Sequence, residues 1–317
     1  AKPRFTRRLR HPSSPMPRLL ILSQDASEYK RLIQAADLPG LSIFTVMNPT
    51  DTIPCSDEFD LLLGEPALIS QVVNCLPELL WAQCTWAGVE PLLQPGIRRD
   101  YTLTNVRFVY GPQMSEYVFG YLLLIARGTL ARLQAQREVC WDTTLPGTLR
   151  RKTLGLLGVG SIGCHLVRLA SGLQLNVLGF DIQQNPAFIE AGGQYVSLES
   201  LLSMADFISI HLTLNSHTLH FMDRHKFSQM KPGAFLINTS RGKVVDEQAL
   251  LDALRSGHLG GAALDVFESE PPASTGLTEM DNVVSTPHIG AYTDETLRLM
   301  DETCISTLRD ALQSSAH

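Results

Sequence analysis

The stretch "TLGLLGVGSIGCHLVRLASGLQLNVLGFD" (residues 153–181) decides the fold of this chain. An apolar run is followed by a glycine-rich turn, an amphipathic run and a second apolar run that stops at Asp181. This order predicts a strand, a tight turn, a helix and a parallel strand. Two interpretations are open, a structural strand-to-helix connection or a dinucleotide site, and the acid after the second strand favours the dinucleotide site.

Each glycine of the turn has a physical role in the dinucleotide interpretation. Gly158 permits a tight turn, Gly160 lets the backbone approach a pyrophosphate, and Gly163 lets the helix pack close to the sheet. The amides of Ser161 and Ile162 would lie at the helix N-terminus, where partial positive charge attracts phosphate.

Asp181 bears on the choice of cofactor. Its carboxylate could accept hydrogen bonds from both hydroxyls of an adenosine ribose, and it would repel a 2′-phosphate. The residues after it, "IQQNP", contain no Arg or Lys that could pair with such a phosphate. The sequence therefore predicts NAD rather than NADP.

Composition limits the class of protein. The 317 residues suffice for two domains, and 44% hydrophobic with 18% charged residues is typical of a globular enzyme. The net charge of −6 argues against a nucleic-acid partner, and no apolar run is long enough to span a membrane. The cysteines form no CxxC pair, so we expect no metal site, and reduced thiols in a cytoplasmic protein. They are Cys55, Cys75, Cys84, Cys140, Cys164 and Cys304.

Residues 1–15, "AKPRFTRRLRHPSSP", are rich in Arg, contain no acid and lack the apolar segment of a secretory signal. An added leader, an upstream translated extension and a mitochondrial-type address remain open. We expect an extension outside the folded core.

Short apolar runs alternate with helical patterns along the chain, which predicts parallel sheets wound by βαβ units. The first expected strands cover 18–23, 41–46, 59–64, 79–85 and 101–105. The second series covers 153–158, 176–181, 206–211, 234–239, 261–267 and 282–286. Expected helices cover 26–37, 246–257, a long stretch at 114–141 bent at Gly120 or Gly128, and a last helix at 294–315 that packs on the first domain.

Three segments of the sequence match a known family: "GLLGVGSIG", "INTSRGKVVDEQALLDALRSGHLGGAALDVFESEP" and "STPHIGAYT". In these the chain resembles the D-isomer-specific 2-hydroxyacid dehydrogenase family. "TWAGVEPLL" and "GPQMSEYVFGYLL" are similar to its short glyoxylate/hydroxypyruvate reductase branch. The resemblance implies an α/β fold of two Rossmann-like lobes with parallel sheets. It implies a discontinuous substrate domain (16–111 plus 291–317) with an inserted NAD-binding domain (112–290), and the active site between the lobes.

The resemblance places a catalytic trio on Arg241, Glu270 and His288. Reduction of a 2-keto acid needs a hydride and a proton, so His288 is expected as the general acid, and as the base in oxidation. Glu270 would favour and orient the protonated ring, and Arg241 would hold the substrate carboxylate and keto oxygen. The structural alternatives are a loop cap for Arg241, a solvated acid for Glu270 and a loop histidine for His288.

The resemblance also implies contacts with the nicotinamide end of the cofactor. The matching positions are Leu212, Thr213, Thr218, Thr239, Ser240 and Asp265. The family usually has proline where Thr213 stands, and Asp265 could instead simply end a buried strand. We expect His165 and His211 to be structural.

The segment "QCTWAGVEP" predicts the substrate end of the site. Gly88 permits close approach of backbone amides to a carboxylate, and Trp86 either walls the pocket or packs in the core. Relatives usually have aspartate where Glu90 stands. Expected substrate contacts are Trp86, Ala87, Gly88, Val89, Arg241 and Tyr292, with Met114 facing the pocket and Tyr117 packing.

A pocket of this kind suits glyoxylate, hydroxypyruvate, pyruvate or another short 2-keto acid, paired with its D-2-hydroxy acid. An NADH-sensing binding protein similar to corepressors is the alternative from another class. Phosphoglycerate, formate and phosphite dehydrogenases share the implied fold and stay open as well. The resemblance further implies a homodimer, with the region 114–141 in the contact.

Overall fold

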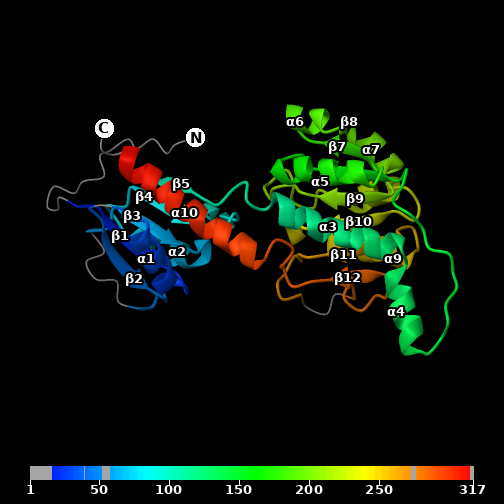
Figure 1. The fold of residues 1–317 in the computed structure, drawn as a ribbon, viewed down its shortest axis with the longest axis horizontal. Coiled ribbons are helices and arrows are strands. Elements are labelled where there is room, and N and C mark those ends of the chain that lie inside the picture. Colours follow the sequence, from blue (N-terminus) through cyan, green and yellow to red (C-terminus); the bar gives the residue numbers. More distant parts are fainter. Residues whose placement is uncertain (1–15, 39, 52–57, 273–275, 315–317) are drawn as a thin grey trace. The chain divides into compact units, whose positions relative to one another are not determined.

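A computed structural model describes residues 16–38, 40–51, 58–272 and 276–314. The expected N-terminal extension (1–15) and Cys55 lie outside these ranges. The chain forms two compact units, one comprising the chain through Val109 and from Asp294 onward, the other Tyr110–Thr293. The sequence placed these divisions at 111/112 and 290/291. Both units are α/β with parallel sheets, so the predicted fold class is confirmed (Figure 1).

The first unit contains a five-stranded parallel sheet in the order β2-β1-β3-β4-β5. Its strands are β1 Arg18–Leu22, β2 Ser42–Val46, β3 Leu61–Gly64, β4 Trp81–Cys84 and β5 Thr102–Thr104. Its helices are α1 Ala26–Ala35, α2 Pro66–Val72 and α10 Asp294–Ser314, with short 3₁₀ turns η2 Val73–Cys75 and η3 Glu90–Leu93. Because parallel strands end at the same edge, the loops after β3 and β4 lie side by side.

The terminal helix α10 belongs to the first unit, as its apolar periodicity predicted. It contacts β4 and α1. The side-chain Nε2 of Gln83, on β4, donates a hydrogen bond of 3.8 Å to the buried sulfur of Cys304 on α10. The sheet core beneath it is closed by large apolar side chains such as Trp81 and Phe59, both fully buried.

The second unit contains a seven-stranded parallel sheet in the order β12-β11-β10-β9-β6-β7-β8, which is the doubly wound Rossmann arrangement with one added strand. Its strands are β6 Thr153–Leu157, β7 Asn176–Phe180, β8 Gln194–Tyr195, β9 Phe207–Ile210, β10 Phe235–Asn238, β11 Gly261–Leu264 and β12 Val283–Ser285. Every strand expected from the sequence forms, and among the strands in the described ranges β8 alone was not expected. Two residues are too few for a periodic pattern, so β8 had no signal.

The long helix expected over 114–141 is wrong in its extent. The chain forms α3 Gly111–Ala126 and then a separate α4 Thr129–Arg137, and Gly128 between them has a φ of +59°. Glycine adopts this left-handed conformation without a Cβ clash, which ends the first helix. No residue of α4 is buried, and the helix extends away from the sheet (Figure 1).

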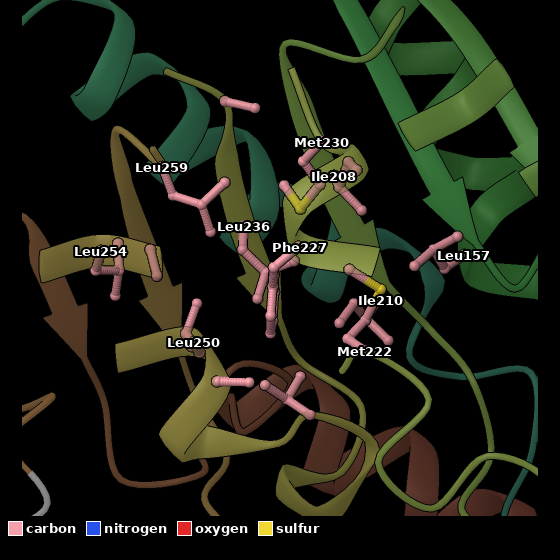
Figure 2. Close-up of a cluster of buried hydrophobic side chains, with 14 of the residues drawn as sticks. Leu157, Ile208, Ile210, Met222, Phe227, Met230, Leu236, Leu250, Leu254 and Leu259 are labelled. Atoms are coloured by element: carbon pink, nitrogen blue, oxygen red, sulfur yellow. The ribbon is translucent and has the colours of Figure 1, made fainter. Parts of the chain in front are cut away.

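The remaining helices of the second unit are α5 Ser161–Gly172, α6 Pro186–Glu190, α7 Leu198–Met204, α8 Arg224–Gln229 and α9 Glu247–Arg255, with the 3₁₀ turn η4 Gly242–Val244. Side chains from the strands, α8 and α9 interdigitate in one apolar cluster, with Phe227 and Leu236 at its centre (Figure 2). Burial of this surface, at about 25 cal/mol per Å², is what holds the loops at the strand ends in place.

None of the helices in the described ranges is both long and apolar enough to cross a membrane. Within the same ranges, His, Cys, Asp and Glu side chains do not gather as a metal ion would require. The five described cysteines are free thiols.

Candidate active site

The glycine-rich turn between β6 and α5 has the geometry that a dinucleotide requires. Gly158 has a φ of +92°, and a Cβ built on it would stand 2.7 Å from the carbonyl oxygen of His211. Only glycine fits this position. A Cβ on Gly160 would meet nothing within 4 Å, so its surface is open beside the first amides of α5, including those of Ser161 and Ile162.

The role expected of Gly163 is less strict than the sequence suggested. A Cβ there would stand 3.4 Å from Cγ1 of Val159, which is ordinary van der Waals contact. Close packing against the sheet is therefore present, but it does not by itself exclude alanine.

Asp181, directly after β7, holds the glycine-rich turn. Its Oδ2 accepts a hydrogen bond of 2.7 Å from the backbone amide of Val159, and its Oδ1 accepts one of 3.2 Å from the backbone amide of Gln183. Each carboxylate oxygen has a second acceptor site, so ribose hydroxyls could still bind. The neighbouring Ile182 is 95% exposed. The two hydrogen-bond partners of the Asp181 carboxylate are backbone amides, not Lys or Arg side chains.

The loop after β9 contains Leu212, Thr213 and Thr218. Leu212 packs on the apolar cluster of Figure 2, while Thr213 is exposed. The Thr218 hydroxyl donates a hydrogen bond of 2.6 Å to the carbonyl of Thr213 and thereby closes the loop on itself. The loop is thus ordered by its own polar groups.

Thr239 and Ser240 follow β10, and the buried Asn238 shapes their loop. Asn238 Oδ1 accepts hydrogen bonds from the amide and the hydroxyl of Ser240, and its Nδ2 donates to the carbonyl of Arg241 at 3.1 Å. Thr239 Oγ1 is buried and has no hydrogen-bond partner in the described structure. An unsatisfied hydroxyl of this kind fits a site built for a polar ligand.

Arg241 is placed by the contact of Gly242 with the next loop. A Cβ on Gly242 would stand 1.8 Å from the carbonyl carbon of Phe267, so the two backbone segments touch. The guanidinium Nη1 of Arg241 donates a hydrogen bond of 2.7 Å to the carbonyl of Ser240. Arg241 therefore leaves the sheet beside the segment that leads to Glu270.

Glu270 and His288, two members of the predicted trio, are in direct contact. Nδ1 of His288 lies 2.8 Å from Oε2 of Glu270, and Oε1 of Glu270 accepts a hydrogen bond of 3.1 Å from the amide of Phe267. With Nδ1 donating its hydrogen bond to this carboxylate, Nε2 of His288 is the ring nitrogen on the opposite side from Glu270. Both side chains keep more than a third of their surface exposed.

Asp265, which was expected to be a cofactor contact or the end of a buried strand, is hydrogen-bonded to the loop of His288. It is 2% exposed, and its two carboxylate oxygens accept hydrogen bonds from Thr286, Ile289 and Gly290 at 2.7–2.8 Å. These donors belong to the loop that contains His288. Asp265 thus holds this loop, and it also lines the pocket beside His288.

A pocket of about 350 Å³ opens beside this pair, within the second unit. Its lining residues are Asp265, Phe267, Glu270, Pro271, Pro272, Ser285, Thr286, Pro287 and His288. The walls are mostly apolar, with His288 and Glu270 as polar groups in the lining, which is typical of small-molecule sites.

The expected substrate loop, Trp86 to Val89, lies in the first unit, after β4. Trp86 is 39% exposed, so it is not a core aromatic. The side-chain Nδ2 of Asn105 donates a hydrogen bond of 2.5 Å to the backbone carbonyl of Ala87. Val89 packs on the core of that unit. In the second unit, Tyr292 is 49% exposed, whereas Met114 is 6% exposed and packs in α3.

Sequence reasoning missed Asn238 and Gly242 as residues that shape the site. Gly242 had a signal, because a glycine directly after a candidate catalytic arginine indicates close backbone approach. Asn238 had none, since an asparagine at a strand end is common in loops. His165 packs its ring against Gly111 on α3, in agreement with a structural role.

The fold and the site together define a dinucleotide-binding α/β protein with a histidine–carboxylate pair. Residues 119–290 match the family model for the D-isomer specific 2-hydroxyacid dehydrogenase NAD binding domain. The chain is 40% identical over 237 residues to D-3-phosphoglycerate dehydrogenase of Escherichia coli, covering 72% of this chain and 57% of that protein. It is 37% identical over 220 residues to glyoxylate reductase of Thermococcus litoralis, covering 66% of each.

Solved structures give the same result. A D-isomer specific 2-hydroxyacid dehydrogenase family protein from Aeromonas salmonicida has a TM-score of 0.82 at 38% identity, covering 90% of this chain and 93% of that one. D-lactate dehydrogenase from Aquifex aeolicus, solved with NAD and lactic acid, has a TM-score of 0.80 at 25% identity, covering 94% and 96%. The chain belongs to the D-isomer specific 2-hydroxyacid dehydrogenase family and contains its NAD binding domain.

Proposed function

We propose that the protein is an NAD(H)-dependent oxidoreductase that interconverts a small 2-keto acid and its D-2-hydroxy acid. The observation that carries the proposal is the 2.8 Å contact between Nδ1 of His288 and Oε2 of Glu270 at the mouth of a largely apolar pocket. A bound nicotinamide would supply or accept the hydride. The residues of this chain would donate or accept the proton.

His288 is the general acid in the direction of reduction. Glu270 holds Nδ1, so the proton on Nε2 passes to the carbonyl oxygen as the hydride arrives at the carbonyl carbon. The adjacent carboxylate stabilises the imidazolium before transfer. In oxidation, neutral Nε2 takes the hydroxyl proton.

Arg241 is the group for the substrate carboxylate. Its guanidinium is a planar fork of donors, which matches the geometry of a carboxylate and a neighbouring keto oxygen. The hydrogen bond from Nη1 to the Ser240 carbonyl holds the side chain at the end of β10. We also assign to the substrate the backbone amides of Ala87 to Val89 and the exposed ring of Trp86, in the first unit.

The residues of the second unit fit NAD better than NADP. The turn at Gly160 and the α5 amides would hold the pyrophosphate, and Asp181 would accept the ribose hydroxyls. The Asp181 carboxylate and the exposed Ile182 offer nothing to a 2′-phosphate. Leu212, Thr213, Thr218, Thr239, Ser240 and Asp265 are the groups that we assign to the nicotinamide side.

Short 2-keto acids, namely glyoxylate, hydroxypyruvate and pyruvate, are the proposed substrates. Similarity to a glyoxylate reductase and to a D-lactate dehydrogenase supports this class. Similarity to a phosphoglycerate dehydrogenase keeps a phosphorylated substrate as a second candidate, although the chain matches a little over half of that relative.

Oxidation of NADH, followed by its nicotinamide absorbance, tests the function. Purified protein is mixed with each of the three keto acids, with phosphohydroxypyruvate and with buffer. We expect turnover with at least one unphosphorylated acid and little with the phosphorylated one. NADH binding without any turnover would instead support the NADH-sensing alternative, and a clear preference for phosphohydroxypyruvate would support the second candidate.

We also propose a homodimer that uses α4 and the segment after it. Leu133 on α4 is 46% exposed, and Val139, Trp141 and Leu145 are each more than 90% exposed. Apolar side chains gathered on a projecting segment are typical of a covered surface. Sedimentation velocity of the wild type should give a dimer, and Trp141→Ser combined with Leu145→Ser should give a monomer. A wild-type monomer at micromolar concentration would contradict the proposal.

A further inference from the structure

The buried carboxylate of Asp265 is the centre of a hydrogen-bond network beneath the pocket. It lies one residue after β11 and is 2% exposed. Oδ1 accepts from the Ile289 amide at 2.8 Å and from the Thr286 hydroxyl at 2.7 Å, and Oδ2 accepts from the Gly290 amide at 2.8 Å. A charge this deeply buried is tolerated only when donors surround it.

The network surrounds a strained residue. His288 has a φ of +55°, in the left-handed region that residues other than glycine rarely adopt. Its amide donates a hydrogen bond of 2.8 Å to the backbone carbonyl of Asp265. Strain of about 1–3 kcal/mol persists only where the surroundings over-determine the conformation. The hydrogen bonds from the Ile289 and Gly290 amides to the Asp265 carboxylate hold His288 in this conformation.

Tyr117 adds a donor from outside the loop. It lies on α3, far from the loop in sequence, and its hydroxyl is 3.3 Å from Oδ1 of Asp265 and in hydrogen-bond contact with the Thr286 hydroxyl. Burial raises the pKa of Tyr117 above its ordinary value, so the phenol keeps its proton. Because the Thr286 proton goes to Asp265, the phenol can donate either to Thr286 or to the carboxylate, and both reinforce the same network.

We propose that Tyr117 is a positioning residue for His288, acting with Thr286 through the Asp265 carboxylate. The phenol fixes that carboxylate, the carboxylate fixes the amides of Ile289 and Gly290, and the two amides hold the loop in which Nδ1 of His288 meets Glu270. Tyr117 itself touches no reacting atom, and its effect on reduction rests on the proposed function.

Tyr117→Phe tests the role directly, because it removes the hydroxyl and keeps the ring that packs edge-on against Tyr121. Hydrogen exchange measured by mass spectrometry should show peptides covering 286–292 exchanging at least threefold faster than in the wild type. Peptides covering α5 should be unchanged. In kinetics, kcat for keto-acid reduction should fall about tenfold, with KM for NADH within twofold of the wild type.

Substitutions at Thr286 test whether the hydroxyl itself is needed. Thr286→Val removes the hydroxyl and should reproduce the loss in kcat, whereas Thr286→Ser keeps it and should retain most of the rate. The double variant Tyr117→Phe with Thr286→Val should lose less than the product of the two single losses, because both act on one carboxylate. Tyr195→Phe is the matched control: it removes a hydroxyl that accepts from the Asn185 amide, and it should leave exchange at 286–292 and kcat unchanged.

Two results would overturn the proposal: unchanged exchange at 286–292 in Tyr117→Phe, or a Thr286→Ser variant as impaired as Thr286→Val. The exchange experiment needs no substrate. A wild type without turnover therefore counts against the proposed function alone, while the exchange result still decides the role of Tyr117.

Discussion

Gly242 lies directly against the backbone of Phe267, so that a Cβ on Gly242 would stand 1.8 Å from the Phe267 carbonyl carbon and 2.4 Å from the Glu268 amide nitrogen. This contact brings the loop of Arg241 to the loop of Glu270. No side chain takes part, so the distance between the two candidate catalytic loops depends on the absence of a side chain at one position.

Gly242→Ala should therefore disturb both loops. The backbone cannot yield as a flexible side chain would, so we expect a loss of unfolding free energy of about 3 kcal/mol and a strong loss of turnover. Urea denaturation measures the stability. Gly172→Ala, at the end of α5 with nothing within 4 Å of the added Cβ, is the control and should be neutral.

Glu270→Gln should reduce the rate of keto-acid reduction by about 100-fold, since an amide cannot stabilise the imidazolium of His288 as a carboxylate does. The affinity for NADH, measured by fluorescence titration, should stay within threefold. Glu268→Gln is the matched control. That acid pairs with His220 and accepts from the Glu247 amide, so its loss should leave the rate within twofold. Equal losses in both variants would remove Glu270 from its assigned role.

Asp181→Asn should relax the choice of cofactor. The amide oxygen can still accept the hydrogen bond from Val159, while the negative charge that repels a 2′-phosphate is gone. We expect the ratio of kcat/KM for NADH over NADPH to fall at least tenfold, without a large change in thermal stability. Asp181→Ala should in addition lower Tm, because the Val159 amide loses its acceptor. A wild type that prefers NADPH would refute the assignment.

His211 should contribute a pH-dependent part of the stability. Burial lowers the pKa of His211 to about 4, from an ordinary value near 6.5, and its Nε2 lies 2.9 Å from the Ser209 hydroxyl. Between these two values the unfolded chain binds a proton that the folded chain does not. Stability therefore falls as the pH is lowered from about 6.5 to 4 and loses nothing further from this group below 4.

The check is the difference between wild type and His211→Gln, which keeps a polar end without titrating. The wild type should lose on the order of 2 kcal/mol more than the variant across that window, in urea denaturation at successive pH values. Parallel curves for the two proteins would show that His211 is protonated as easily in the folded state as in the unfolded state.

The sequence alone determined the strands, the parallel α/β class and the glycine-rich turn, because these follow from local periodicity. Apolar runs of four or five residues became buried strands, and Gly158 has the positive φ that a tight turn requires. The pattern over 114–141 predicted one helix bent at Gly120 or Gly128, whereas the backbone turns left-handed at Gly128 and two separate helices form. The residue pair Glu270 and His288 was expected from motif resemblance, and only the fold brings its atoms to 2.8 Å.

Tertiary structure alone decided what Asp181, Asp265 and Tyr117 do. Asp181 accepts from Val159, and Asp265 accepts from a loop more than twenty residues further along the chain. Tyr117, which lies 148 residues earlier in the sequence, contacts the same carboxylate from helix α3. Hydrogen bonds between residues so distant in sequence have no periodic signature. They depend on how the packed strands and helices bring chain segments together, and packing is a property of the whole unit rather than of any one segment.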